Sequence, residues 1–515
     1  MSIDRRQFIA GLIGAPALIR LTRKAPREIQ GGFVDDGMKV GHALRDASSI
    51  LTPRDRQRVS VAVIGGGISG LSAAWELERR GMRDFVVLEL AADAGGNARS
   101  GSNEISAYPW AAHYVPVPGP RATLVRELFE ELGVLHGGEW EERYLCFSPQ
   151  ERLFMHGEWH TGLEPEFAMS SGDRDQFRRF SELVASHRSG GEFTIPSALG
   201  RDRASPLDRM SMGAWLRQHG FTSPRLLWYV DYACRDDYGA ALDQTSAWAG
   251  IHYFASREAD EQGPLTWPEG NGWITKQLLA KLGRYVTTSA PVLHARHDSG
   301  RWRLTTQATL YEADAVIWAA PAFVAPYVVD ELRDHRHRTA FVYSPWLTAN
   351  LTLDHWPAEH GIEPAWDNVI YDSPGLGYVV ATHQSLRTFQ DRTVWTYYHS
   401  FAELTPEQAR RELTTRDWAY WRDRILDDLA RAHPDIRDCV ARMDILRLAH
   451  AMIRPTVGFL TAPERAQPQK LPRFFRAHSD QSGLSLFEEA QYHGVMAARE
   501  ALAVIGGHWS MAGAR

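Results

Sequence analysis

The chain has 515 residues, of which 44% are hydrophobic and 23% charged, and its formal net charge is −6. A single core stops growing at roughly 250–300 residues, so this length predicts two domains, or one large domain with insertions. The scattered basic residues exclude the clustered basic face of a nucleic-acid-binding protein. The three cysteines lie far apart and show neither metal-ligand spacing nor a disulfide framework, so no metal site is expected.

The first 30 residues have the pattern of an export signal. Arg5 and Arg6 precede the apolar stretch Phe8–Ile19, which is shorter than the roughly 20 residues that span a bilayer, so no membrane span is expected. The segment resembles a bacterial twin-arginine (Tat) signal, which implies periplasmic localisation, with or without removal of residues 1–30. The alternative is an amphipathic or disordered N-terminus with a chance arginine pair. Residues 31–57 are polar, and we interpret them as a lead-in loop.

A glycine-rich turn between a predicted strand and a predicted helix is the strongest pattern in the chain. Val61–Ile64 is a short apolar run, typical of a buried parallel strand. A G-x-G-x-x-G turn occupies 65–70, and a helical pattern begins at Leu71. A second apolar run, Phe85–Leu88, ends at the acidic Glu89. Strand, turn, helix, strand and acid stand in the order of a dinucleotide-binding βαβ unit.

Each residue of this unit has a chemical reason to be there. Gly65 permits the tight turn, Gly67 lets the backbone approach a pyrophosphate, and Gly70 lets the helix pack closely on the strand. The N–H groups of the first helical turn, around Ser69, suit a diphosphate. The carboxylate of Glu89 can accept hydrogen bonds from the ribose hydroxyls. The alternative is a glycine turn in an ordinary βαβ unit.

A second glycine pair, Gly95-Gly96, follows Glu89 and continues through Asn97 to Arg99. This arrangement resembles the FAD-binding domain of the flavin-containing amine oxidase superfamily, which includes phytoene desaturases and protoporphyrinogen oxidases. The resemblance implies that Gly96 and the residues after it pass beside the flavin and the pyrophosphate. In that family an arginine often follows the pair directly. Here Asn97 has that position and Arg99 comes two residues later, so either can meet the cofactor.

Two more segments resemble the same family. Strands expected over 284–321 include Val292, whose backbone would meet the adenine. Near the C-terminus, strand, acid, glycine loop and helix stand in the order of the family's closing FAD motif. The resemblance implies that Asp480, or Ser479 one residue earlier, bonds the ribityl chain. It also implies that the helix expected from Ser485 onward points its N-terminus at the flavin.

The resemblance predicts an α/β fold, with a three-layer Rossmann-like FAD-binding domain and an inserted α+β substrate domain. The expected FAD-binding segments are 58–120, 265–325 and 470–505, and the substrate segments are 121–264 and 326–469. Covalent attachment in this superfamily uses a cysteine just before the closing helix. The corresponding segment here has none, so we expect noncovalent FAD.

Candidates for the flavin face follow from the same resemblance. His113 and Tyr114 stand where the family's chain passes the isoalloxazine, and His450 stands where it supplies a wall of the substrate cage. A buried turn with a hydrogen-bonded histidine is the alternative for His113. Many amine oxidases hold a lysine near flavin N5, but the corresponding stretch 343–350 contains none. That difference weakens amine oxidation and leaves room for carbon–carbon desaturation.

The sequence therefore predicts FAD-dependent oxidation of a small organic substrate, at an amine or a carbon–carbon bond, by hydride transfer to flavin N5. Oxygen or a quinone would then reoxidise the flavin. One alternative is an NAD-dependent dehydrogenase that uses the same glycine loop. The other is a non-enzymatic FAD-binding module.

Overall fold

The computed structural model describes residues 27–34, 37–46, 53–200, 206–257, 263–335, 340–386, 390–466 and 470–506. The twin arginines Arg5 and Arg6 lie outside these residues. Within the described part of the chain, no helix combines the length and the apolar character needed to cross a membrane.

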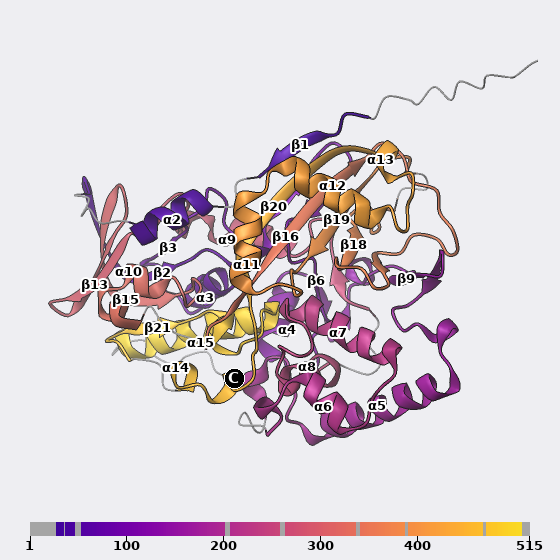
Figure 1. Cartoon of the computed structure of the whole chain (residues 1–515). Coiled ribbons are helices and arrows are strands. Elements are labelled where there is room, and N and C mark those ends of the chain that lie inside the picture. Colours follow the sequence, from indigo (N-terminus) through magenta and orange to yellow (C-terminus); the bar gives the residue numbers. More distant parts are fainter. Residues whose placement is uncertain are drawn as a thin grey trace, which may run out of the picture.

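The glycine turn belongs to a seven-stranded sheet on the left of Figure 1. Its strands run in the order β12 (Val286–Thr287), β3 (Phe85–Leu88), β2 (Asp55–Ile64), β15 (Thr309–Trp318), β14 (Arg301–Thr305) and β13 (His294–Asp298), and β21 (Phe474–Arg476) pairs with β15. The pairs joining β12, β3, β2, β15 and β21 are parallel, whereas β13, β14 and β15 form an antiparallel meander.

Both faces of this sheet are buried, which explains the continuous apolar run of β2. Val61 and Val63 face one core, and Ala62 and Ile64 face the other, as the two-residue period of a strand requires. The first core contains residues of four helices: α3 (Ile68–Arg79), α4 (Thr123–Glu131), α9 (Gly272–Leu282) and α15 (Phe487–Ile505). Strands β13 and β14 and helix α10 (Ala325–Val328) contribute to the second. Helices, parallel sheet and meander are the three expected layers.

The inserted domain has an eight-stranded sheet, at the upper right of Figure 1. The strands run in the order β1 (Gln30–Phe33), β20 (Val440–Ile453), β16 (Tyr343–Leu353), β19 (Thr393–His399), β18 (Gly377–Val380), β17 (Asp367–Ile370), β9 (Glu151–Met155) and β10 (Glu158–Thr161). Helices α11 (Pro406–Thr415), α12 (Trp418–Leu429) and α13 (Ile436–Cys439) pack on it. A helical lobe lies below, formed by α5 (Ser171–Gly190), α6 (Met212–Gln218), α7 (Pro224–Tyr238) and α8 (Ala247–Ala255).

The α/β class with an inserted α+β domain is confirmed, and three expected boundaries need correction. The segment 31–57 is not only a loop, because it contains most of β1, all of helix α2 (Met38–Asp46) and the start of β2. Residues 122–135 belong to the nucleotide domain, since α4 packs into its core. Residues 325–332 do so as well, against the meander. Strand β1 could not be predicted from the sequence, because its residues Gln-Gly-Gly-Phe lack alternation and depend on pairing with β20.

Candidate functional site

A cavity of about 910 Å³ lies between the two domains. Its walls come from the ends of β2, β3 and β15, from α2, α11 and β20, and from the loop before α15. Ten of the eleven predicted cofactor-binding residues line it: Gly65, Gly67, Ser69, Glu89, Gly96, Asn97, Arg99, Val292, Asp480 and Ser485. Four distant sequence segments thus meet around one space.

Gly70 is the predicted residue that does not line the cavity. A Cβ atom at Gly70 would run into the carbonyl oxygen of Gly65, so this glycine allows the helix to approach the turn. Gly65 itself has a φ of +105°, a conformation that favours glycine. A Cβ atom at Gly96 would lie 3.3 Å from the Cα atom of Gly67. The two glycine motifs therefore lie directly against each other at the cavity wall.

Two helices begin at the cavity without a capping side chain. Helix α3 starts after Gly67 and helix α15 after Leu486, and neither residue has a side-chain hydrogen bond to the first turn. The first N–H groups of a helix have no partner within the helix and carry partial positive charge. The start of α3 therefore suits a diphosphate, and the start of α15 suits an electron-rich ring.

Glu89 lines the cavity beside the glycine turn. Its Oε2 atom accepts a hydrogen bond from the backbone N–H of Gly66 at 2.6 Å, and its Oε1 atom accepts one from Ala91 at 2.8 Å. A carboxylate oxygen has room for a further hydrogen bond, so these bonds orient Glu89 without saturating it. Val292 is buried to 5% exposure and lines the same cavity, although it lies outside a regular strand.

The segment after the second glycine pair has two different side-chain anchors. The amide nitrogen of Asn97 donates a hydrogen bond to the carbonyl oxygen of Ala451 in β20, at 2.7 Å. The Nε atom of Arg99 donates one back to the carbonyl oxygen of Gly96, at 3.2 Å. Both residues line the cavity. Asn97 thus joins the two domains across the cavity, whereas Arg99 stays with its own loop.

Asp480 is held by three groups. Its carboxylate accepts hydrogen bonds from the backbone N–H of Ala322 at 2.8 Å and from the Tyr343 hydroxyl at 2.5 Å, and His478 Nδ1 lies 3.0 Å away. Burial raises the pKa of Asp480, but the charge and hydrogen bond of His478, with the other two bonds, lower it below its ordinary value. Ser479 lines the cavity as well. Ser485 accepts a hydrogen bond from the Ile453 N–H at 3.1 Å.

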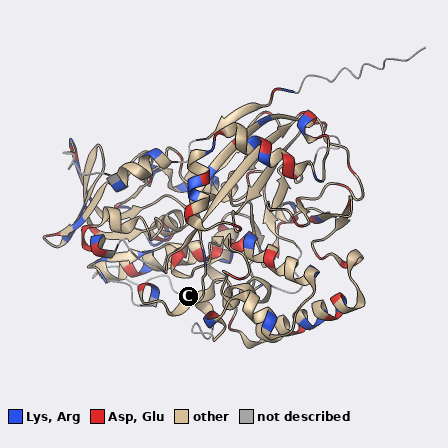
Figure 2. Cartoon of the chain, viewed as in Figure 1, with Lys and Arg blue, Asp and Glu red and all other residues tan. Residues whose placement is uncertain are grey.

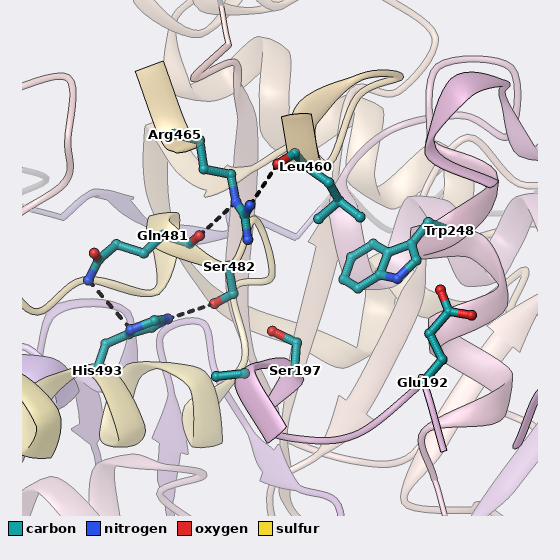
Figure 3. A pocket seen from close by; sticks show the side chains of 9 residues that line it. Glu192, Ser197, Trp248, Leu460, Arg465, Gln481, Ser482 and His493 are labelled. Carbon is teal, nitrogen blue, oxygen red and sulfur yellow. Dashed lines mark hydrogen bonds between the residues drawn. The ribbon is translucent and has the colours of Figure 1, made fainter. Parts of the chain in front are cut away.

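The loop that carries Asp480 is anchored from behind, beside a small polar cavity (Figure 3). The Nε2 atom of His493 lies 3.1 Å from Ser482 Oγ, and Gln481 Nε2 lies 3.4 Å from His493 Nδ1. Gln481 Nε2 also donates to the carbonyl oxygen of Arg476 at 2.7 Å, which identifies it as the amide nitrogen. Because an amide nitrogen only donates, His493 Nδ1 accepts and the ring proton is on Nε2. His493 therefore cannot take a proton from Ser482, and this Ser–His pair positions the loop.

His450 lines the cavity on the substrate-domain side. Its ring stacks on Phe323 with the centroids 4.3 Å apart. Desolvation, with the positive charges of Arg410 and His42, lowers the pKa of His450 to about 4. The ring is therefore neutral at pH 7 and offers one donor and one acceptor.

His113 and Tyr114 do not line this cavity, although the preceding residue, Ala112, does. The ring of His113 packs against Tyr398 and Trp366, at centroid distances of 4.8 and 5.4 Å. Burial lowers the pKa of His113 to about 4. Tyr114 begins β6 (Tyr114–Val115), which pairs with β11 (Leu265–Thr266). Contact of either side chain with flavin or substrate stays a prediction.

The sequence reasoning missed a whole wall of the cavity. Gly37 and residues 38, 41, 42, 44 and 45 of helix α2 line it, and α11 contributes Arg410, Arg411 and Thr414. Figure 2 shows basic residues in the middle of α11. Positions 38, 41, 42 and 45 have the spacing of one helical face, which is the only local sign of this wall. Among the described residues that line the cavity there is no lysine.

Comparisons with known sequences cover small parts of the chain. The family described as NAD(P)-binding Rossmann-like domain matches residues 63–132. A Baeyer-Villiger monooxygenase of Streptomyces coelicolor is 50% identical over 60 residues, which are 12% of this chain and 11% of that protein. The match thus spans about a ninth of that relative's length.

Comparisons with solved structures cover most of the chain. A putrescine oxidase with bound putrescine has a TM-score of 0.65 at 16% identity, covering 87% of this chain and 100% of that one. Cyclohexylamine oxidase from Brevibacterium oxydans has a TM-score of 0.64 at 14% identity, covering 87% and 98%. A fatty acid isomerase from P. acnes has a TM-score of 0.60 at 15% identity, covering 86% and 98%. The chain therefore has the two-domain fold of the flavin amine oxidases and their structural relatives.

Proposed function

We propose that this protein is an FAD-dependent oxidoreductase that oxidises a small organic substrate, at an amine or a carbon–carbon bond. One observation carries the proposal: the glycine turn, the second glycine pair and the start of α15 line a single cavity. An NAD-dependent dehydrogenase needs the first of these sites and has no use for the other two. The likeness to amine oxidases supports the proposal at the level of the fold.

The residues at the cavity fit FAD from end to end. Glu89 would hold the ribose, the start of α3 the diphosphate, and Asp480 or Ser479 the ribityl chain. The uncapped start of α15 would stabilise negative charge on the flavin. When bound, FAD supplies a two-electron acceptor that takes a hydride at N5. The protein then has to position the substrate C–H bond and exclude water.

The substrate side is proposed from fewer residues. The neutral ring of His450 provides a hydrogen-bonding group in the cavity wall, and no described lysine accompanies it. This lack of lysine keeps both amine oxidation and carbon–carbon desaturation open. The fatty acid isomerase with the same fold illustrates that the fold alone does not select the reaction. We propose oxygen or a quinone as the final electron acceptor.

The test is the visible spectrum of the purified protein. We expect a flavin spectrum that bleaches anaerobically with one compound from a panel of amines, amino acids and unsaturated lipids. Acid precipitation should release the colour into the supernatant, because the loop before α15 has no cysteine for a covalent bond. A colourless protein that binds NAD and takes up no FAD would overturn the proposal. A yellow protein that no substrate bleaches would support the binding-module alternative.

We also propose export of the folded, FAD-loaded protein through the twin-arginine pathway. Support comes from Arg5 and Arg6 together with a cofactor that is made in the cytoplasm. Replacing both residues with lysine (Arg5→Lys, Arg6→Lys) keeps the charge but loses the guanidinium geometry. The variant should stay in the cytoplasm, folded and yellow, while the wild type reaches the periplasm. Equal cytoplasmic fractions of both proteins would contradict export.

A further inference from the structure

Strand β1 is an edge strand of the substrate-domain sheet. Strand β1 pairs in parallel with β20, from Gln30 opposite Arg442 to Phe33 opposite Ile445. The Arg447 guanidinium lies over the Phe33 ring, 4.0 Å from its centroid. Phe33 also packs against the core of this sheet. The chain is thus fastened to the substrate domain just before it reaches the cofactor cavity.

Helix α2, which follows β1, runs along the cavity from the ribose end toward the substrate side. At its start, a Cβ atom at Gly37 would lie 3.5 Å from Leu90, the residue after Glu89. Further along, His42 lies near enough to His450 for its charge to lower the pKa of that ring. The cavity side of α2 includes Met38 and the buried Leu44. Helix α2 therefore lines the same cavity as the glycine turn and forms part of its wall.

We propose that β1 and α2 form a strap that binds FAD against the glycine turn and controls its release. This proposal rests on the proposed FAD binding and extends it to Gln30–Phe33 and Met38–Asp46. A ligand between α3 and α2 contacts both, so α2 has to move before the dinucleotide can leave. The anchor of β1 on β20 resists that movement. The strap opens by local unfolding, and the rate of this opening then sets the rate of FAD release.

The test compares FAD release rates from the full-length holoenzyme, followed by flavin fluorescence after dilution. Phe33→Ala removes the anchor at a residue that does not itself line the cavity, although Arg447, which packs on the Phe33 ring, does. Leu44→Ala removes a buried side chain of α2 itself. Each variant should release FAD about tenfold faster, given the cost of deleting a packed side chain. Lys39→Ala is the matched control, since Lys39 is exposed on the same helix and does not line the cavity.

A second measurement needs no variant. Trypsin cuts after Lys39 and Arg45 in α2, and bound FAD should slow both cuts several-fold if it holds the helix in place. The strap proposal would be overturned if Phe33→Ala and Leu44→Ala released FAD at the wild-type rate. It would also be overturned if trypsin cleaved α2 at the same rate with and without FAD. These results leave the proposed function intact, because the wild type is still yellow. A wild type that binds no FAD contradicts the proposed function instead.

Discussion

The two walls of the cofactor cavity are built by different means. One wall, residues 65–99, is a continuous stretch of chain in which backbone sterics decide the shape, as the Gly65–Gly70 approach shows. The other wall consists of side chains from α2, α11 and β20, segments up to about 400 residues apart in the chain, gathered only by the fold. The backbone wall leaves no room for an added atom at Gly70, whereas the side chains of the other wall can adjust. Substitutions should therefore have large effects on the first wall and graded effects on the second.

The largest effect is expected at Gly70. In Gly70→Ala the new methyl group overlaps the carbonyl oxygen of Gly65, so helix α3 and the turn must separate. We expect loss of FAD binding and a thermal midpoint lower by several degrees, as for an overpacked core costing about 1–3 kcal/mol. Gly283→Ala is the control, because a Cβ atom there has no neighbour within 4 Å. A yellow Gly70→Ala protein with wild-type stability would show that the helix and the turn can accommodate a methyl group at position 70.

Glu89 comes next. In Glu89→Ala the ribose loses its acceptor and the N–H groups of Gly66 and Ala91 lose theirs. Hydrogen bonds to a charged group are worth about 1.5–3 kcal/mol, so FAD affinity should fall about tenfold to a hundredfold with the fold intact. Glu89→Gln keeps one acceptor oxygen, so its FAD affinity should lie between those of the wild type and Glu89→Ala. Equilibrium dialysis measures both, and unchanged FAD content in Glu89→Ala would place the ribose elsewhere.

The contrast between the walls also explains what the sequence could predict. Eight of the ten predicted residues that line the cavity belong to the local motifs at 65–70, 95–99 and 480–485, whose spacing reflects nearby backbone geometry; Glu89 and Val292 are the other two. The place of helix α2 at the cavity could not be predicted, because the strand before it pairs with β20, more than 400 residues away. The placement of His113 could not be predicted for a similar reason. Its aromatic neighbours Trp366 and Tyr398 come from a distant sheet, which no local pattern announces.

His450 belongs to the wall of side chains from α2, α11 and β20. Its substitution should affect turnover more than cofactor affinity. His450→Ala removes the ring stacked on Phe323 and leaves the glycine turn untouched. Turnover should fall about tenfold, as for a modest loss of substrate positioning. With a pKa of about 4 the ring stays neutral from pH 5.5 to 8, so the pH profile of kcat in that range should keep its shape in the variant. A profile whose limb disappears in His450→Ala would show instead that this ring titrates during turnover.

The smallest effect is expected behind the cavity, at His493. This ring accepts a hydrogen bond from Gln481 and donates one to Ser482, and so it supports the loop of Asp480 without lining the cavity itself. In His493→Phe both bonds are lost while the packing volume is kept. A typical hydrogen bond contributes about 0.5–1.5 kcal/mol, so FAD affinity should fall about threefold to tenfold.

A matched control separates loop positioning from a general weakening of α15. Glu500→Gln changes an exposed residue of the same helix and should leave FAD affinity unchanged. The flavin absorption maximum should shift in His493→Phe but not in Glu500→Gln, because only the first variant releases the loop of Asp480. Since the ring proton is on Nε2, His493 does not activate Ser482, and a fluorophosphonate should not label the wild type. Labelling at Ser482 would reverse the tautomer assignment and make the pair a nucleophile rather than a support.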